Sequence, residues 1–167
     1  MYAALFKFKA KSNREILAEL AKSGLDATQL DGMTAIRTMN HTYVVDQIFK
    51  AHLTGATHSY VAANTVETPM LAELQAQIAE LDAWWIDYVS ALTAEQLAEQ
   101  IDFAFTDGKQ GSMTREEILL HVITHGCYHR GAVGLVLTRQ GMTAPPETFT
   151  RYLHEAEPAR RNAGSAR

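Results

Sequence analysis

The stretch Thr114–Gly131, with the sequence TREEILLHVITHGCYHRG, contains a helix start followed by three evenly spaced histidines. Thr114 and Glu117 have the pattern of a capping box, in which each side chain accepts a hydrogen bond from the backbone N–H of the other residue. Apolar residues follow at helical spacing, and Gly141 is typical of the position just beyond a helix end. These features predict a long helix over about residues 115–140.

Three further segments have the apolar spacing of amphipathic helices, over about residues 3–23, 34–54 and 69–92. A polar turn separates the first two, and Gly55 marks the end of the second. Thr68-Pro69 is typical of a helix start, with threonine as the N-cap and proline as the first helical residue. Ser12-x-x-Glu15 offers the first helix a later start, but the longer version is preferred.

Between the third and the last long helix, the apolar spacing changes from helical to alternating. Ile101, Phe103 and Phe105 alternate with polar residues, and Asp107-Gly108 is typical of a hairpin turn. This pattern predicts a small β-hairpin directly before the last long helix. A capping box over residues 93–96 predicts a single turn of helix ahead of the hairpin.

Together these elements predict an all-α fold. It is a four-helix bundle with a long crossover after the second helix, a small β-hairpin before the fourth and a short C-terminal helix. The 167 residues suit one domain, which we assign to residues 1–157, with residues 158–167 as a flexible tail. Bundles hold ligands and metals between facing helices, so the apolar faces are where functional residues are expected.

The composition argues against several classes of protein. A formal net charge of −4 leaves no broadly basic surface, so no nucleic-acid partner is expected. Cys127 is the single cysteine, which excludes an internal disulfide and a zinc site made of several cysteines, and a reducing cytoplasm is the expected location. No apolar run approaches the about 18 residues of a membrane span, so no membrane partner is expected.

His121, His125 and His129 lie four residues apart on the last predicted long helix. Each step of four residues turns about 40° around a helix, so the three side chains span about 80° of one face. Ile118 and Val122 lie on the same arc, which indicates that the histidines point toward the core. Buried imidazoles need partners for both ring nitrogens, and a divalent metal is one such partner.

A metal site in a bundle needs ligands from more than one helix. His121 and His129 are about 12 Å apart along the helix axis, so all three histidines cannot easily bind one ion. His125 and His129 leave a tetrahedral site incomplete, and His41, on the apolar stripe of the second helix, is the natural third ligand. Three neutral ligands leave a coordination position open. The spacing alone supports this site and a set of packed core histidines about equally, and His121 could be a ligand, a partner of a ligand or a core residue.

Four other residues have weaker assignments. His52 lies on the same stripe of the second helix, but about three turns away, and is not expected to share the ion. His58 and His154 are expected on the surface. Asp46, one turn beyond the candidate ligand of the second helix, could orient a ligand, bind Arg130 or form another ion pair.

Three motifs carry a resemblance to a known family: TMNHTYVVDQIF at 38–49, HVITHGCYHRG at 121–131 and PPETFTRYL at 145–153. With these motifs in this order, residues 1–157 resemble the DinB/YfiT-like family of metal-binding four-helix bundles. The resemblance implies a site for a divalent metal, nickel or zinc, and a homodimer. By position it assigns the ligands to His41, His125 and His129.

The resemblance also marks departures from the family pattern. His121 matches a frequent family histidine that is not normally a ligand. Tyr128 stands where many members have a histidine before the last ligand, and Phe49 stands where many have a tryptophan. Both changes are expected to alter the surroundings of the site.

Relatives include thiol-dependent isomerases and transferases. The resemblance therefore implies a metal-dependent enzyme, of the hydrolase or the thiol-dependent transferase or isomerase type, acting on a small molecule or thiol. No catalytic residue is assigned, because no carboxylate neighbours His125 or His129 on their helix face. The alternatives are a non-catalytic metal-binding or stress-response protein, and a bundle whose histidines only pack.

Overall fold

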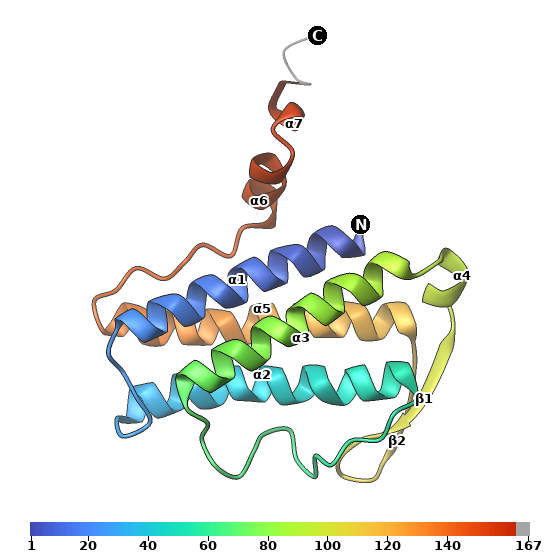
Figure 1. The fold of residues 1–167 in the computed structure, drawn as a ribbon, viewed down its shortest axis with the longest axis horizontal. Coiled ribbons are helices and arrows are strands. Elements are labelled where there is room, and N and C mark those ends of the chain that lie inside the picture. The colour runs from blue at the N-terminus through green and yellow to red at the C-terminus, as the bar shows by residue number, and fades with distance from the viewer. Residues whose placement is uncertain (163–167) are drawn as a thin grey trace.

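The computed structural model describes residues 1–162, which form a bundle of four long helices with a two-stranded hairpin at one end (Figure 1). The long helices are α1 (Tyr2–Lys22), α2 (Leu30–Thr54), α3 (Leu71–Ala91) and α5 (Arg115–Arg139). The shorter elements are α4 (Ala94–Leu97), β1 (Gln100–Ala104), β2 (Gln110–Thr114), α6 (Phe149–Ala156) and α7 (Ala159–Asn162). The predicted bundle, with its hairpin and short C-terminal helix, is confirmed. None of the described helices is long and apolar enough to cross a membrane.

Helix α2 begins at Leu30, so the predicted start at Thr34 is four residues too late. Gly32, in the predicted polar turn, belongs to the first turn of the helix, where a Cβ would lie 2.1 Å from the backbone oxygen of Asp26. The turn itself is made by Asp26, whose carboxylate accepts hydrogen bonds from the backbone N–H and the hydroxyl of Thr28. Gly32 is therefore needed for close packing against this turn.

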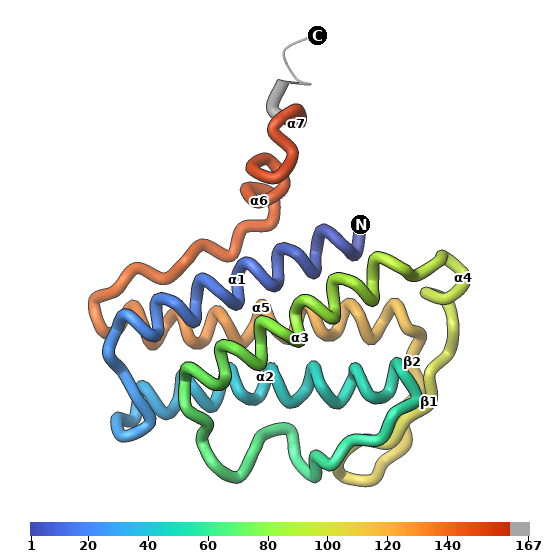
Figure 2. Tube along the Cα trace, in the orientation of Figure 1, coloured from blue at the N-terminus to red at the C-terminus, as the bar shows by residue number. Residues whose placement is uncertain are grey.

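Helix α3 begins at Leu71, so the prediction of Thr68 as N-cap and Pro69 as first helical residue is wrong. Thr68 instead accepts a hydrogen bond from Arg37 Nη1 at 3.3 Å, which ties the end of the crossover to α2. The crossover starts at Gly55, whose φ of 66° ends α2 in the left-handed conformation. Figure 2 shows this irregular segment running back alongside the bundle from the end of α2 to the start of α3.

The local signals around the hairpin are confirmed. The capping box before α4 is present, and so is the one before α5. In the latter, Thr114 Oγ1 accepts a hydrogen bond from the backbone N–H of Glu117 at 3.2 Å, and Glu117 Oε2 accepts one from the backbone N–H of Thr114 at 2.7 Å. Strands β1 and β2 pair antiparallel, with Phe103 opposite Gly111.

We expect Thr114→Ala to lower the free energy of unfolding by about 1 kcal/mol, because α5 loses its N-terminal cap. Urea unfolding followed by circular dichroism measures the change. Thr34→Ala is the control, since Thr34 is an exposed threonine whose hydroxyl donates to a carbonyl of its own helix. Equal stability of the two variants would contradict the capping role.

The buried apolar residues form two clusters along the bundle. The cluster nearest the hairpin surrounds Trp85, which is fully buried and stacks on Phe6 at 5.3 Å between ring centroids. The other cluster lies near the start of α2 and includes Leu20, Met39 and Leu74. On each long helix, buried polar or charged residues lie near the junction of the two clusters.

These buried polar residues form a charged layer that joins all four long helices. Lys9 Nζ on α1 lies 2.7 Å from Asp46 Oδ2 on α2 and 2.6 Å from Asp82 Oδ1 on α3. Asn13 Nδ2 donates to Asp82 Oδ2 at 2.8 Å, and Arg130 Nη1 on α5 donates to Asn13 Oδ1 at 2.9 Å. Of the roles considered for Asp46, the structure shows an ion pair between helices, with Lys9 as the partner.

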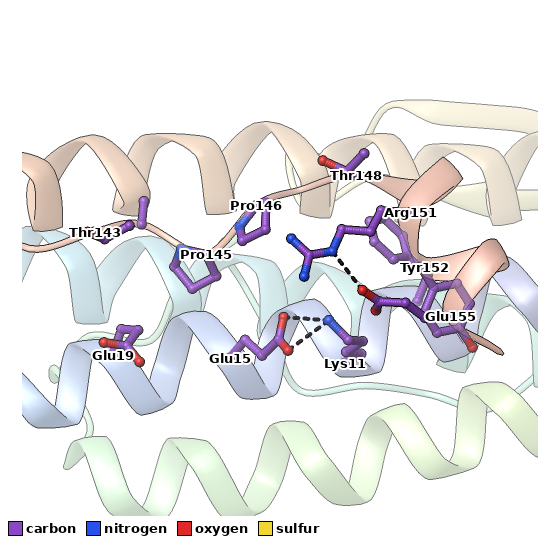
Figure 3. A pocket seen from close by; sticks show the side chains of 12 residues that line it. Lys11, Glu15, Glu19, Thr143, Pro145, Pro146, Thr148, Arg151, Tyr152 and Glu155 are labelled. Atoms are coloured by element: carbon purple, nitrogen blue, oxygen red, sulfur yellow. Dashed lines mark hydrogen bonds and ion pairs between the residues drawn. The ribbon is translucent and has the colours of Figure 1, made fainter.

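The C-terminal segment folds back over α1. Phe8 on α1 contacts Phe149 and Tyr152 on α6, with ring centroids 5.4 and 5.6 Å apart. Figure 3 shows the pocket between α1 and the C-terminal segment, where the ion pairs Lys11–Glu15 and Arg151–Glu155 lie close together. Within the predicted tail, residues 159–162 form α7, and residues 163–167 lie outside the described part of the chain, so its flexibility stays a prediction.

Candidate metal centre

Three imidazole rings from two helices meet at the middle of the bundle. His41 comes from α2, and His125 and His129 come from α5, one turn apart. One nitrogen from each ring lies within 4.8 Å of the other two, and the Nε2 atoms of His41 and His125 are 2.9 Å apart. The structure thus brings together the three residues that the sequence singled out, while their role as metal ligands stays a prediction.

The crossover holds His41 in its orientation. The Nδ1 of His41 lies 2.6 Å from the carbonyl oxygen of Ala63, so Nδ1 carries the proton and donates it, and Nε2 is left with a lone pair. The preceding residue, Asn40, hydrogen-bonds to Asn64 and to Thr65 Oγ1 and so fixes the crossover beside the ring. The role of Ala63 could not be predicted, because nothing in the sequence of an irregular segment indicates which carbonyl faces a ring.

The surroundings of His125 and His129 keep these two rings neutral. Burial lowers the pKa of His125 to about 3, and the neighbouring rings of His129 and His41 add to this effect. The pKa of His129 is lowered by burial and by His41. An uncharged imidazole is the form that binds a metal, so His125 and His129 need not lose a proton first at neutral pH.

The donor set fits a divalent transition metal. Zinc–nitrogen bonds of about 2.0–2.1 Å at a tetrahedral angle place ligand nitrogens about 3.3 Å apart, and the nitrogens here lie between 2.9 and 4.8 Å apart. His125 turns its Nε2 toward His41, while its Nδ1 is buried with no hydrogen-bond partner among the described residues, so Nε2 is the nitrogen that would bind the ion. Three imidazoles suit zinc and nickel alike.

His121 lies beside the three-histidine group without belonging to it. Its ring stacks on that of His125 at 5.3 Å between centroids and contacts Phe49 at 5.0 Å. Of the three roles left open for it, the structure favours that of a partner packed against a candidate ligand. Tyr128 is 76% exposed and meets His129 edge-on at 5.1 Å, so this departure from the family pattern lies on the solvent side of the site.

A second pair of histidines lies near the hairpin. His52 stacks on Phe103 with centroids 4.8 Å apart and meets His58 at 5.3 Å. His58 and His154, both predicted on the surface, are half-buried; the crossover that folds over the end of α2 covers part of His58. His52 lies outside the three-histidine group, as expected. On α6, His154 Nδ1 donates to the carbonyl oxygen of Thr150 in its own helix.

Cys127 belongs to a polar cluster away from the three imidazoles. Its Sγ lies 3.5 Å from Glu147 Oε1 and accepts a hydrogen bond from Arg130 Nη2 at 3.4 Å. Burial raises the pKa of the thiol, which keeps it protonated at neutral pH. Cys127 therefore lacks the thiolate character of a nucleophile.

A cavity of about 200 Å³ adjoins the three-histidine group on the hairpin side. Its wall includes His125, one of the three histidines, and Ala63, whose carbonyl oxygen orients His41. The rest of the wall comes from the second half of α2, from the hairpin and from His121. Such a cavity can admit a small molecule to the side of His125.

The fold and the site define a class: helical bundles in which two of the long helices bring three histidines together. A model of the DinB family matches residues 1–162, and the chain belongs to this family. A crystal structure of a DinB-like protein from Bacillus cereus has the same fold, with a TM-score of 0.63 at 18% sequence identity. The match covers 84% of this chain and 91% of the other. Comparison with curated proteins gave no significant match.

Proposed function

We propose that the protein binds a divalent transition metal, zinc or nickel, through His41, His125 and His129, and acts as a metal-dependent enzyme on a small molecule in the cytoplasm. The observation that carries the proposal is the convergence of three imidazole nitrogens within 4.8 Å of one another. Membership of the DinB family supports the same assignment.

An open site supports catalysis over a purely structural role for the metal. Structural zinc sites use four protein ligands, whereas catalytic sites use three and keep a position for water or substrate. Here the described residues place three candidate ligands together, and a cavity leads to one of them. When bound, the metal lowers the pKa of a coordinated water or thiol and so supplies a nucleophile at neutral pH.

The residues of the chain favour a thiol over water as the attacking group. Among the described residues, no carboxylate belongs to the three-histidine group, so the site has no evident general base. A thiol is more acidic than water and needs less help to lose its proton. We therefore propose a thiol-dependent transferase or isomerase, with hydrolysis as the second reaction to test.

Metal analysis tests the first half of this proposal. Protein purified without a histidine tag and incubated with zinc is expected to hold one ion per chain after gel filtration. His129→Ala is expected to lower the affinity by at least about 100-fold, because a direct ligand is lost. His154→Ala is the matched control, since His154 lies on α6 and bonds only to its own helix among the described contacts. Equal zinc contents in the two variants would rule the site out.

A reaction screen tests the second half. Loaded wild-type protein, His129→Ala and His154→Ala are assayed for transfer of low-molecular-weight thiols to electrophilic substrates and for hydrolysis of activated esters. Turnover by the wild type and by the control, and its loss in His129→Ala, is the expected result. Stoichiometric zinc without turnover of any substrate would favour a non-catalytic metal-binding protein.

A further inference from the structure

The cavity beside His125 has an uncharged and largely aromatic wall. Phe49 and Phe103 meet edge to face at 5.8 Å, and His52 stacks on Phe103. Burial lowers the pKa of His52, so this ring is neutral at neutral pH. Among the described residues that line the cavity, none carries a formal charge. A charged group would lose its hydration there without gaining a partner.

A pocket on another side of the bundle offers a contrast. The pocket between α1 and α6 has a volume of about 410 Å³, and Lys11, Glu15 and Arg151 line it (Figure 3). That pocket is twice as large, is charged, and lies away from the three histidines. The small cavity at His125 is therefore distinguished both by its apolar wall and by its contact with the candidate metal centre.

The hairpin is built to place two phenyl rings at this cavity. Gly111 on β2 lies opposite Phe103 on β1. A Cβ at Gly111 would lie 2.7 Å from the ring of Phe103 and 2.8 Å from that of Phe105, so any larger residue would displace both rings. Phe105 is 48% exposed, which places it at the solvent side of the cavity wall.

We propose that this cavity binds an uncharged aromatic ring of the molecule whose polar group reaches the three histidines. A cavity of about 150 Å³ with apolar walls holds benzene, so about 200 Å³ accommodates one six-membered ring with a small substituent. The aromatic wall offers the offset-stacked and edge-to-face contacts that aromatic rings prefer. The inference rests on the proposed function, because the polar end of the molecule needs a metal to bind.

Two hydroxamic acids test the inference by calorimetry on zinc-loaded protein. Acetohydroxamic and benzohydroxamic acid carry the same metal-binding group, and only the second has a ring. We expect the ring to increase the affinity at least about tenfold, as burial of its apolar surface predicts. 4-Carboxybenzohydroxamic acid is expected to lose most of this gain, because its added carboxylate finds no cation in the cavity.

Variants identify where the ring binds. Phe105→Ala is expected to reduce the affinity for benzohydroxamic acid at least about threefold and to leave that for acetohydroxamic acid unchanged. Leu135→Ala, which removes an exposed apolar side chain from α5, is the control and should change neither. In NMR spectra, the ring signals of His52 should move with benzohydroxamic acid and stay in place with acetohydroxamic acid.

The outcomes separate the two proposals. If neither acid binds because the protein does not retain zinc, the proposed function fails. If both acids bind the zinc-loaded protein equally well, or if Phe105→Ala and the His52 signals show no effect of the ring, the metal site stands and the cavity inference is overturned. A preference for the charged ring would overturn it as well.

Discussion

Replacing Lys9 with methionine is expected to lower the free energy of unfolding by about 3–5 kcal/mol, which is the cost of removing one partner from a buried ion pair. Lys9 is 2% exposed, and its ammonium group contacts carboxylates from two other helices, Asp46 and Asp82. Burial opposes its charge, but the two carboxylates outweigh burial and raise the pKa of Lys9. Methionine fills a similar volume and leaves both carboxylates buried without their cation.

The loss should depend on pH. Burial raises the pKa of Asp46 to about 6 even beside Lys9, and removing the cation raises it further. Because this pKa is higher in the folded than in the unfolded chain, the folded chain takes up a proton on Asp46 more readily. Protonation of Asp46 therefore stabilises the fold in acid, and this contribution is lost as the pH rises through about 6. Lys9→Met should therefore be less damaging at pH 5 than at pH 8.

Urea unfolding at the two pH values measures both effects. Lys11→Met is the control, since the neighbouring Lys11–Glu15 pair is partly exposed and its loss should change stability by at most about 0.5 kcal/mol. Adding Asp46→Asn to Lys9→Met should restore part of the loss, because one buried charge is removed. A Lys9→Met protein as stable as Lys11→Met would show that the charged layer does not bear on stability.

Zinc is expected to raise the stability of the protein by about 4 kcal/mol at a free concentration 1,000 times the dissociation constant. For a domain of this size, that corresponds to an increase of about 8–16 °C in the melting temperature. The reason is that the metal joins α2 to α5 in the folded chain only. Thermal unfolding with and without zinc measures the effect, and His41→Ala should abolish it while His154→Ala retains it.

Acid is expected to affect the stability of the metal-free and the zinc-loaded protein differently. The pKa of His125 is about 3 in the folded chain and ordinary in the unfolded chain, so the unfolded chain binds more protons between about pH 6.5 and 3. The metal-free protein should therefore lose stability as the pH falls through this window. Zinc should still stabilise at pH 6, because few protons compete for His125. A zinc effect that is equal in His41→Ala and wild type would contradict the assignment of this ligand.

The parts of the fold that could be predicted from sequence depend on residues close together in the chain. The capping box of Thr114 and Glu117 and the end of α2 at Gly55 need only neighbouring residues, and both are present. The predicted start of α2 is too late because a glycine in the sequence is compatible both with a turn and with close packing inside a helix, and Gly32 has the second role. The prediction of Thr68 as a helix cap is wrong because its hydroxyl accepts a hydrogen bond from Arg37, which lies on another element.

The same division holds at the candidate site. Helical periodicity placed His125 and His129 on one face, and the apolar stripe of α2 added His41. Three other features join residues that are far apart in the chain, and no spacing rule predicts them. They are the contact of His41 with the carbonyl oxygen of Ala63, the ion pair of Lys9 with Asp46, and the cavity under the hairpin.

The charged layer has a consequence for how the imidazoles meet. A slide of one long helix by a single turn, about 5.4 Å, would move Lys9 or Arg130 into one of the apolar clusters and leave the opposing carboxylates alone. The charged layer thus fixes the position of α2 relative to α5 along the bundle axis. If a cation binds at the proposed site, it meets His41 already facing His125, and little binding energy would be spent on bringing the two rings together.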